Sequence, residues 1–249
     1  GGSDFTIMEP DTFSYLILKN THHQAPGPVY LNESINLDQS NTGWTFINEN
    51  TGRTLYWVGD AGNWQDEQHW ALTSGGTPGY CPPTLLDTAI FDQNSFTFPD
   101  QRVSTINYSM QQNVRVLSIE GLDEMNTSFD FNNLNIYGSI LIKDHNLDFY
   151  SYHIRMKGAG ANEVIALAKD GCRYLNFVNK GQWTLAAPLV VEFIDFAEGQ
   201  LHTNNQSMEI LSVYFYTNRF KKLDLSDSDV LILGNTYRTE WDYSGDSLY

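Results

Sequence analysis

Short strand-like segments recur along the second half of this chain at nearly constant spacing. Ile154, Phe177, Leu201 and Leu225 follow one another at intervals of 23, 24 and 24 residues. Each interval holds several short apolar pieces separated by Asn, Gly or Asp, which favour tight turns. Periods of about 20–50 residues are typical of solenoids, propellers and repeat arrays. The spacing therefore indicates coils that bury their apolar faces by stacking on one another.

The local pattern predicts strands rather than helices. Residues 134–142 alternate between apolar and polar and are split by Gly138, which predicts a strand, a bend and a second strand. The best helical candidate, residues 164–168, is short and is followed by Asp170-Gly171. We predict an all-β chain dominated by a right-handed parallel β-solenoid (β-helix). A β-sandwich array stays open as the alternative, because its strands also recur with similar turns.

The charge balance excludes some classes of partner. The sequence has 30 acidic and 14 basic residues, and its net charge of −16 repels phosphate backbones and anionic lipids. We therefore do not expect nucleic-acid binding. The sequence also contains no run of about 18 apolar residues, so we do not expect membrane insertion. The two cysteines, Cys81 and Cys172, lie far apart in the sequence, and their pairing is left open.

The most distinctive local motif is Tyr56-Trp57-Val58-Gly59-Asp60-Ala61-Gly62-Asn63-Trp64, followed by Trp70, Cys81-Pro82-Pro83-Thr84 and Asp87-Thr88-Ala89. This motif resembles the start of the repeat in very large surface proteins of gliding and related Bacteroidetes. Those adhesin-like proteins are exported by type IX secretion. Such repeats often carry a second cysteine further along the chain, and the comparable stretch here, residues 114–117, has none.

The resemblance implies secretion, an extracellular location at the cell surface and an extended repetitive stalk. We therefore expect a structural and adhesive module that touches neighbouring repeat units, surface polysaccharide or other surface proteins, and we do not expect an enzyme. Two alternatives remain. One is a carbohydrate-binding or polysaccharide-cleaving β-helix, which a row of exposed aromatics and acids on one face would favour. The other is a partner subunit of a secretion or motility complex.

Two distant parts of the sequence resemble each other, and this similarity, here called the echo, indicates how the chain is divided. Residues 30–37, 43–46 and 52–56 resemble residues 224–231, 240–243 and 245–249. We therefore expect residues 1–55 to be the tail of a preceding repeat unit. Residues 56–113 are expected to form a Trp/Gly-rich cap and initial segment, and residues 114–249 the solenoid coils.

Three tryptophans, Trp57, Trp64 and Trp70, are the candidate site residues. Each indole offers about 150–250 Å² of apolar area, and nearby glycines permit sharp bends. Our preferred interpretation is a cap over the open end of the first coil. The alternative is a ligand-contact platform on which sugar rings stack.

The sequence predicts no catalytic, cofactor or metal residues. It lacks nucleophile and phosphate-loop motifs, and its acidic residues fit turns in which they bond to local backbone. The turn around Asp227 and Asp229 leaves a structural calcium ion open, but it lacks the glycine and distal glutamate of an EF-hand loop.

Overall fold

The computed structural model describes residues 12–14, 16–18, 21–24, 28–32, 34–36, 41–47, 52–105, 111–144, 147–167, 171–215, 217, 219–225 and 227–234. By their contacts the residues fall into two compact units, 1–51 and 52–249. The two units are described separately below.

The first unit contains short parallel strand pairs. Its strands are β1 (Thr12–Ser14), β2 (Ile17–Leu18), β3 (Val29–Asn32), β4 (Ile35–Asn36) and β5 (Trp44–Ile47). One sheet has the order β1-β3-β5 and the other pairs β2 with β4, all in parallel. The chain thus passes alternately through two small sheets, as it does in a solenoid coil.

The described residues of the second unit form sixteen strands and one 3-10 turn, η1 (Glu67–His69). Its strands are β6 (Thr54–Trp57), β7 (Gly62–Asn63), β8 (Trp70–Ala71), β9 (Thr88–Phe91), β10 (Arg102–Ser104), β11 (Gln112–Val114), β12 (Val116–Ile119), β13 (Ser128–Ile136), β14 (Ile140–Ile142), β15 (Asp148–Met156), β16 (Glu163–Ala166), β17 (Cys172–Leu185), β18 (Leu189–His202), β19 (Met208–Phe215), β20 (Lys221–Asp224) and β21 (Val230–Ile232).

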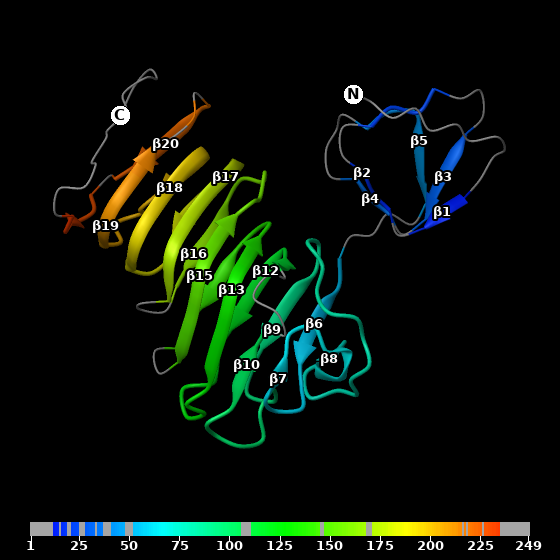
Figure 1. The fold of residues 1–249 in the computed structure, drawn as a ribbon, viewed down its shortest axis with the longest axis horizontal. Coiled ribbons are helices and arrows are strands. Elements are labelled where there is room, and N and C mark those ends of the chain that lie inside the picture. The colour runs from blue at the N-terminus through cyan, green and yellow to red at the C-terminus, as the bar shows by residue number, and fades with distance from the viewer. Residues whose placement is uncertain are drawn as a thin grey trace. The chain divides into compact units, whose positions relative to one another are not determined.

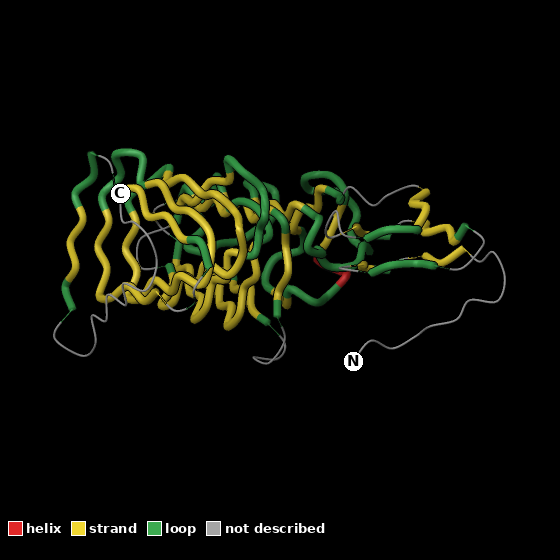
Figure 2. Tube along the Cα trace, turned by 90° about the horizontal axis from the view of Figure 1, so that it is seen from above, coloured by secondary structure: helices red, strands yellow, loops and turns green. Residues whose placement is uncertain are grey.

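These strands form two ladders of parallel pairs (Figure 1). The long-strand ladder runs through β7, β10, β13, β15, the first parts of β17 and β18, β19 and β21. The short-strand ladder runs through β6, β9, β12, β14, β16, the last parts of β17 and β18, and β20. The chain alternates between the ladders and makes about nine turns, seen as stacked loops in Figure 2. The predicted parallel β-solenoid is confirmed, and the sandwich alternative is excluded because a sandwich is built from antiparallel sheets.

The predicted repeat spacing of 23–24 residues is wrong in detail. Ile154 pairs with Leu175, 21 positions on, and Phe177 pairs with Phe196, 19 positions on. Leu201 lies in the other ladder and pairs with Leu223. The coils differ in length because their turns differ, while register is set by which side chains point inward.

Inward-facing residues stack from coil to coil to form the core. One row pairs Met156, Phe177, Phe196 and Phe215, and its last two ring contacts have centroids 4.4 and 5.7 Å apart. The neighbouring row is aliphatic and buried, and it contains Ile154, Leu175, Ile194 and Val213. Each row is buried only because the next coil covers it, so stability depends on stacking.

The N-terminal end of the solenoid is closed by β8. This two-residue strand pairs with β6 in antiparallel fashion, and the register places Trp57 opposite Trp70. It therefore occupies an edge of β6 that another chain could otherwise extend.

The predicted domain boundaries are corrected in two places. The first boundary lies at 51/52 rather than 55/56, because β6 pairs with β8 and β9 of the solenoid. The boundary predicted at 113/114 does not separate two bodies. Strands β10 and β11 both pair with β13, so residues 56–113 already contribute coils.

A corner of the solenoid is filled by Trp183. Its Nε1 donates to the Gly138 carbonyl at 3.0 Å, and a Cβ on Gly181 would lie 2.4 Å from its ring. That Cβ would also lie 2.7 Å from the carbonyl oxygen of Gly158. Only glycine fits at position 181, because the ring and the backbone of the preceding coil both approach there.

We expect Gly181→Ala to lower the free energy of unfolding by about 1–3 kcal/mol, because the ring or the backbone must shift. Equilibrium urea unfolding measures this change. The control is Gly160→Ala, where the nearest atom is the mobile Oε1 of Glu163 at 3.0 Å. Equal losses in the two variants would show that the Trp183 corner is not tightly packed.

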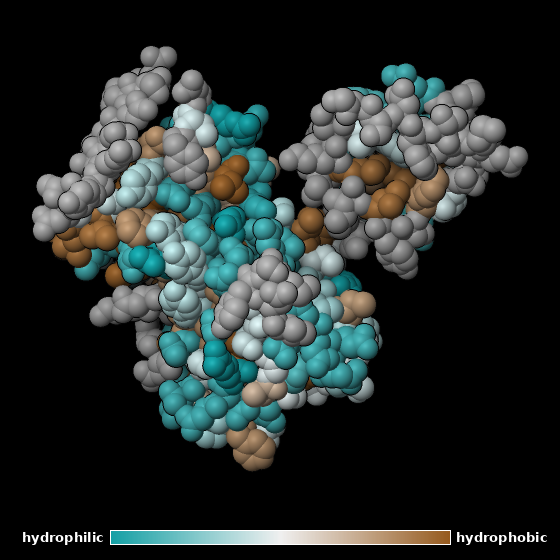
Figure 3. Space-filling view, viewed as in Figure 1, coloured by the Kyte–Doolittle hydropathy of each residue, from teal (hydrophilic) through white to brown (hydrophobic). Residues whose placement is uncertain are grey.

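The surface of the solenoid that faces the viewer in Figure 3 is mainly hydrophilic, with apolar residues gathered near β19. The apolar side chains exposed at that end include Leu211, Leu231, Ile232 and Leu233. Ile232 continues the inward row of Ile210.

Candidate functional site

The outward face of the long-strand ladder carries the candidate site. Along β15, β17 and β18 the inward–outward alternation is interrupted at one shared place, where two successive residues both avoid the core. These residues are Tyr152-His153, Arg173-Tyr174 and Glu192-Phe193, and the parallel register places them side by side. The bend therefore repeats at the same place in successive coils and lines up chemically active side chains on one face.

A row of aromatic rings crosses this face. We call it the aromatic row, and its members are His153, Tyr174, Phe193 and Tyr214. Successive centroids lie 4.8, 4.7 and 6.1 Å apart, and the first two contacts are stacked. Because the ring faces pack against each other, the row links the coils and leaves little ring face for a ligand.

A polar network runs beside the aromatic row. Asn176 donates from Nδ2 to Asp195 at 2.5 Å, and its Oδ1 lies 3.2 Å from Nδ1 of His153. Burial raises the pKa of Asp195, and the hydrogen bond from Asn176 opposes that rise. Burial also lowers the pKa of His153, helped by the nearby Arg155 charge, while the hydrogen bond with Asn176 opposes that fall. Burial and the Arg155 charge, rather than the hydrogen bond with Asn176, therefore favour a neutral His153.

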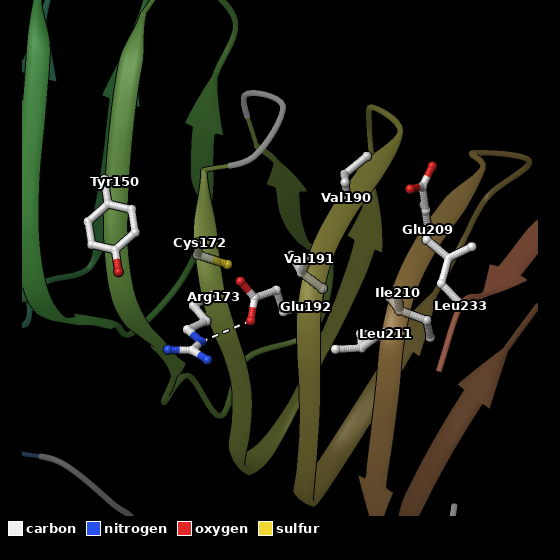
Figure 4. Close-up of a pocket in the computed structure, with 10 residues that line it drawn as sticks. All are labelled: Tyr150, Cys172, Arg173, Val190, Val191, Glu192, Glu209, Ile210, Leu211 and Leu233. Carbon is white, nitrogen blue, oxygen red and sulfur yellow. Dashed lines mark hydrogen bonds and ion pairs between the residues drawn. The ribbon is translucent and has the colours of Figure 1, made fainter. Parts of the chain in front are cut away.

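An open hollow of about 490 Å³, here called the recess, lies next to these rows on the same face. It is lined by Tyr150, Cys172, Arg173, Val190, Val191, Glu192, Glu209, Ile210, Leu211 and Leu233 (Figure 4). The position beside Tyr150 on the next coil is Gly171, whose carbonyl accepts from the Ser151 amide.

Tyr150 and an ion pair provide the polar and aromatic groups of the recess. The Tyr150 residue is 45% exposed, and its ring contacts no other aromatic ring among the described residues. Arg173 Nε donates to Glu192 Oε2 at 2.9 Å, and Figure 4 shows the two side chains meeting across β17 and β18. The hydrogen bond and charge of Glu192 raise the pKa of Arg173. Tyr150, unlike the aromatic row, offers an open ring.

The guanidinium of Arg173 is held in place from several sides. Its Cζ lies 5.4 Å from the ring centroid of Tyr152 and 5.6 Å from that of Tyr174.

Glu209, on β19, is exposed and forms no hydrogen bond or ion pair with a described residue. The recess thus presents a fixed donor group, a paired carboxylate and a carboxylate that is open to a ligand.

The tryptophans predicted as cap or platform residues are buried. Trp57, Trp64 and Trp70 are 0%, 2% and 0% exposed, and all three contact the ring of Phe91. Their indole nitrogens are engaged where described: Trp57 Nε1 donates to Asp60 O, and Trp70 Nε1 donates to Trp64 O. This arrangement fits a packed cap, and none of the three indoles offers the open face that a sugar platform requires.

The acidic residues at the turns, Asp227 and Asp229 among them, have local partners or stand apart. Asp144 accepts from the amides of Gly121 and Leu122 at 2.9 and 2.6 Å, which clamps a turn of the preceding coil. Asp224 pairs with Lys222 at 3.3 Å, and Asp227 and Asp229 are exposed. Within the described ranges no group of three His, Cys, Asp or Glu residues could hold a metal ion.

The two cysteines are unpaired. Cys81 is exposed, whereas Cys172 is buried at the start of β17. Burial raises the pKa of the Cys172 thiol to about 12. The described residues also contain no helix of the length and hydrophobicity needed to cross a membrane.

Sequence reasoning missed the recess and the aromatic row. The usable signal was the repeated pair of outward residues, which becomes visible only after successive coils are aligned by register. The repeat spacing predicted from the sequence aligned Ile154 with Phe177, two positions away from its true partner Leu175. This wrong alignment concealed the repeated pair of outward residues.

Comparisons with protein-family models, with curated proteins and with solved structures gave no match.

Proposed function

We propose that this protein is a structural and adhesive module of a large bacterial cell-surface protein. The observation that carries the proposal is the unbroken pair of parallel ladders from β6 to β21, in which each coil is bonded to the next. Such stacking resists bending and buries the backbone polar groups that proteases and other strands would engage. The resemblance of the Trp57–Trp64 motif to surface-protein repeats supports extracellular display.

The echo between the two units supports a tandem arrangement. Residues 30–37 overlap strands β3 and β4, and residues 224–231 overlap the end of β20 and the start of β21. The remaining late echo, residues 240–249, lies outside the described residues. We propose that neighbouring repeat units of the same chain are partners of this module.

Antibody labelling tests the surface assignment. An antibody raised against residues 52–249 is expected to label intact cells of the source organism as strongly as permeabilised cells. Brief protease treatment of the intact cells should remove most of the signal, whereas a cytoplasmic marker should survive. Labelling that requires permeabilisation would contradict the proposal.

A second candidate function, polysaccharide binding or cleavage, is favoured by one observation. Aromatic, basic and acidic side chains share the outward face of the long-strand ladder, which is the arrangement expected of a polysaccharide-contacting solenoid. Binding is better supported than cleavage, because the Arg173 side chain is already engaged in an ion pair with Glu192. The third candidate, a partner subunit of a secretion or motility complex, would use the apolar residues exposed near β19.

A further inference from the structure

We propose that the recess binds a neutral, linear oligosaccharide that lies along the solenoid axis. This inference extends the polysaccharide contact of the proposed function and rests on it only in that respect. The site consists of Tyr150, Arg173, Glu192 and Glu209, with Val190 and Leu211 as apolar walls.

The mixture of donors and acceptors selects the chemistry of the ligand. Arg173 has five N–H donors, of which Nε is used by Glu192 and Nη1 by a long contact to Tyr152, so donors remain. Glu209 supplies only acceptors at neutral pH. Arg173 and Glu192 neutralise each other, so Glu209 is the remaining charge among the lining residues, and it repels an anion, whereas a sugar hydroxyl both donates and accepts. The set therefore fits an uncharged polyol better than an anion.

The aromatic group fits the same class of ligand. The open ring of Tyr150 offers an apolar surface for the C–H face of a sugar ring, and its hydroxyl is available at the rim. The apolar walls at Val190 and Leu211 complete a site that is mostly apolar with a few placed polar groups, as small-ligand sites are.

The spacing of the strands sets the length of the ligand. Tyr150 lies on β15 and Glu209 on β19, three pairings apart through β17 and β18. Neighbouring strands lie about 4.8 Å apart, so the two side chains are separated by roughly 14 Å along the axis. A single sugar ring cannot span that distance, and a chain of several sugars can.

The site is held ready for binding by the fold. All four residues stand on paired strands, and Arg173 is fixed by Glu192 and by the rings of Tyr152 and Tyr174. Arg173 and Glu192 therefore lose little side-chain freedom when a ligand binds, which favours affinity.

Calorimetric titration of the full 249-residue chain tests the proposal. The probes are maltohexaose, cellohexaose and mannohexaose as neutral chains, together with glucose, hexagalacturonate and hexalysine. We expect at least one neutral hexasaccharide to bind, and glucose to bind at least tenfold more weakly. No binding of any neutral hexasaccharide would overturn the proposal, and so would tighter binding of hexagalacturonate or hexalysine.

Two variants place the binding site at the recess. Tyr150→Ala is expected to lower the affinity about tenfold or more, and Glu209→Gln about threefold to tenfold. Both side chains are exposed, so the fold should survive. Tyr80→Ala and Glu124→Gln are matched controls on exposed residues of loops outside the recess. Equal losses in the variants and their controls would place binding elsewhere. If the protein binds an oligosaccharide but the antibody does not label intact cells, surface display is refuted and the proposal for the recess stands.

Discussion

Replacing Trp183 with alanine is expected to lower the free energy of unfolding by about 3–5 kcal/mol, the usual cost of emptying a buried tryptophan site. The side chain is 1% exposed, its ring lies 5.2 Å from that of Phe177, and its Nε1 is bonded to the Gly138 carbonyl. The substitution leaves a cavity at the corner where β17 turns from one ladder to the other, together with an unpaired carbonyl.

Equilibrium urea unfolding measures this loss through the transition midpoint. The control is Phe98→Ala, because Phe98 is 62% exposed. The control should change the stability by no more than about 0.5 kcal/mol. If Trp183→Ala were as mild as Phe98→Ala, the corner would not be packed as described.

Replacing Asp87 with alanine is expected to cost about 2–4 kcal/mol. The carboxylate is fully buried and accepts from the Arg53 amide at 2.6 Å, from the Arg53 guanidinium at 2.9 Å and from the Thr84 amide at 2.7 Å. Removing the carboxylate leaves these donors without their acceptor at the start of β9. We place the loss below the upper limit for a buried ion pair because the Arg53 side chain is 34% exposed and water can reach it.

The same residue is expected to make stability depend on pH. Burial alone would raise the pKa of Asp87, but the hydrogen bonds from Arg53 and Thr84 outweigh it and lower the pKa. A lowered pKa means that the contribution is complete above the unfolded value of about 3.9 and is lost as the pH falls through the folded pKa. Asp87→Asn should therefore lose more stability at neutral pH than in strong acid.

Asp148→Asn is the control for this titration, because Asp148 is exposed and its carboxylate has no described partner. Because this variant keeps Asp87, its stability should follow that of the wild-type protein between neutral pH and acid. Parallel pH profiles for wild-type protein and Asp87→Asn would contradict the assignment.

Local strand patterns in the sequence were sufficient to predict the fold class. Residues 134–142 do form the end of β13, a glycine bend and β14, and the weak helical candidate after Glu163 is strand β16. These predictions succeeded because alternation and turn residues act over a few neighbours. The coil length was predicted less well, because it depends on turns whose lengths differ from one coil to the next.

The candidate site could not be predicted from the sequence. Tyr150, Arg173, Glu192 and Glu209 come from four strands, and only the register brings them onto one face. By contrast, the three cap tryptophans could be found directly, because their spacing between glycine bends marks large apolar side chains that must be covered.

One measurement tests most directly whether this structural and adhesive module holds polysaccharide without cleaving it. The full chain is incubated with insoluble neutral polysaccharides, and bound protein and newly formed reducing ends are measured in the same samples. We expect the protein to be retained and no reducing ends to appear above a protein-free control. Release of reducing ends that scales with protein concentration would contradict the proposal and make this solenoid an enzyme.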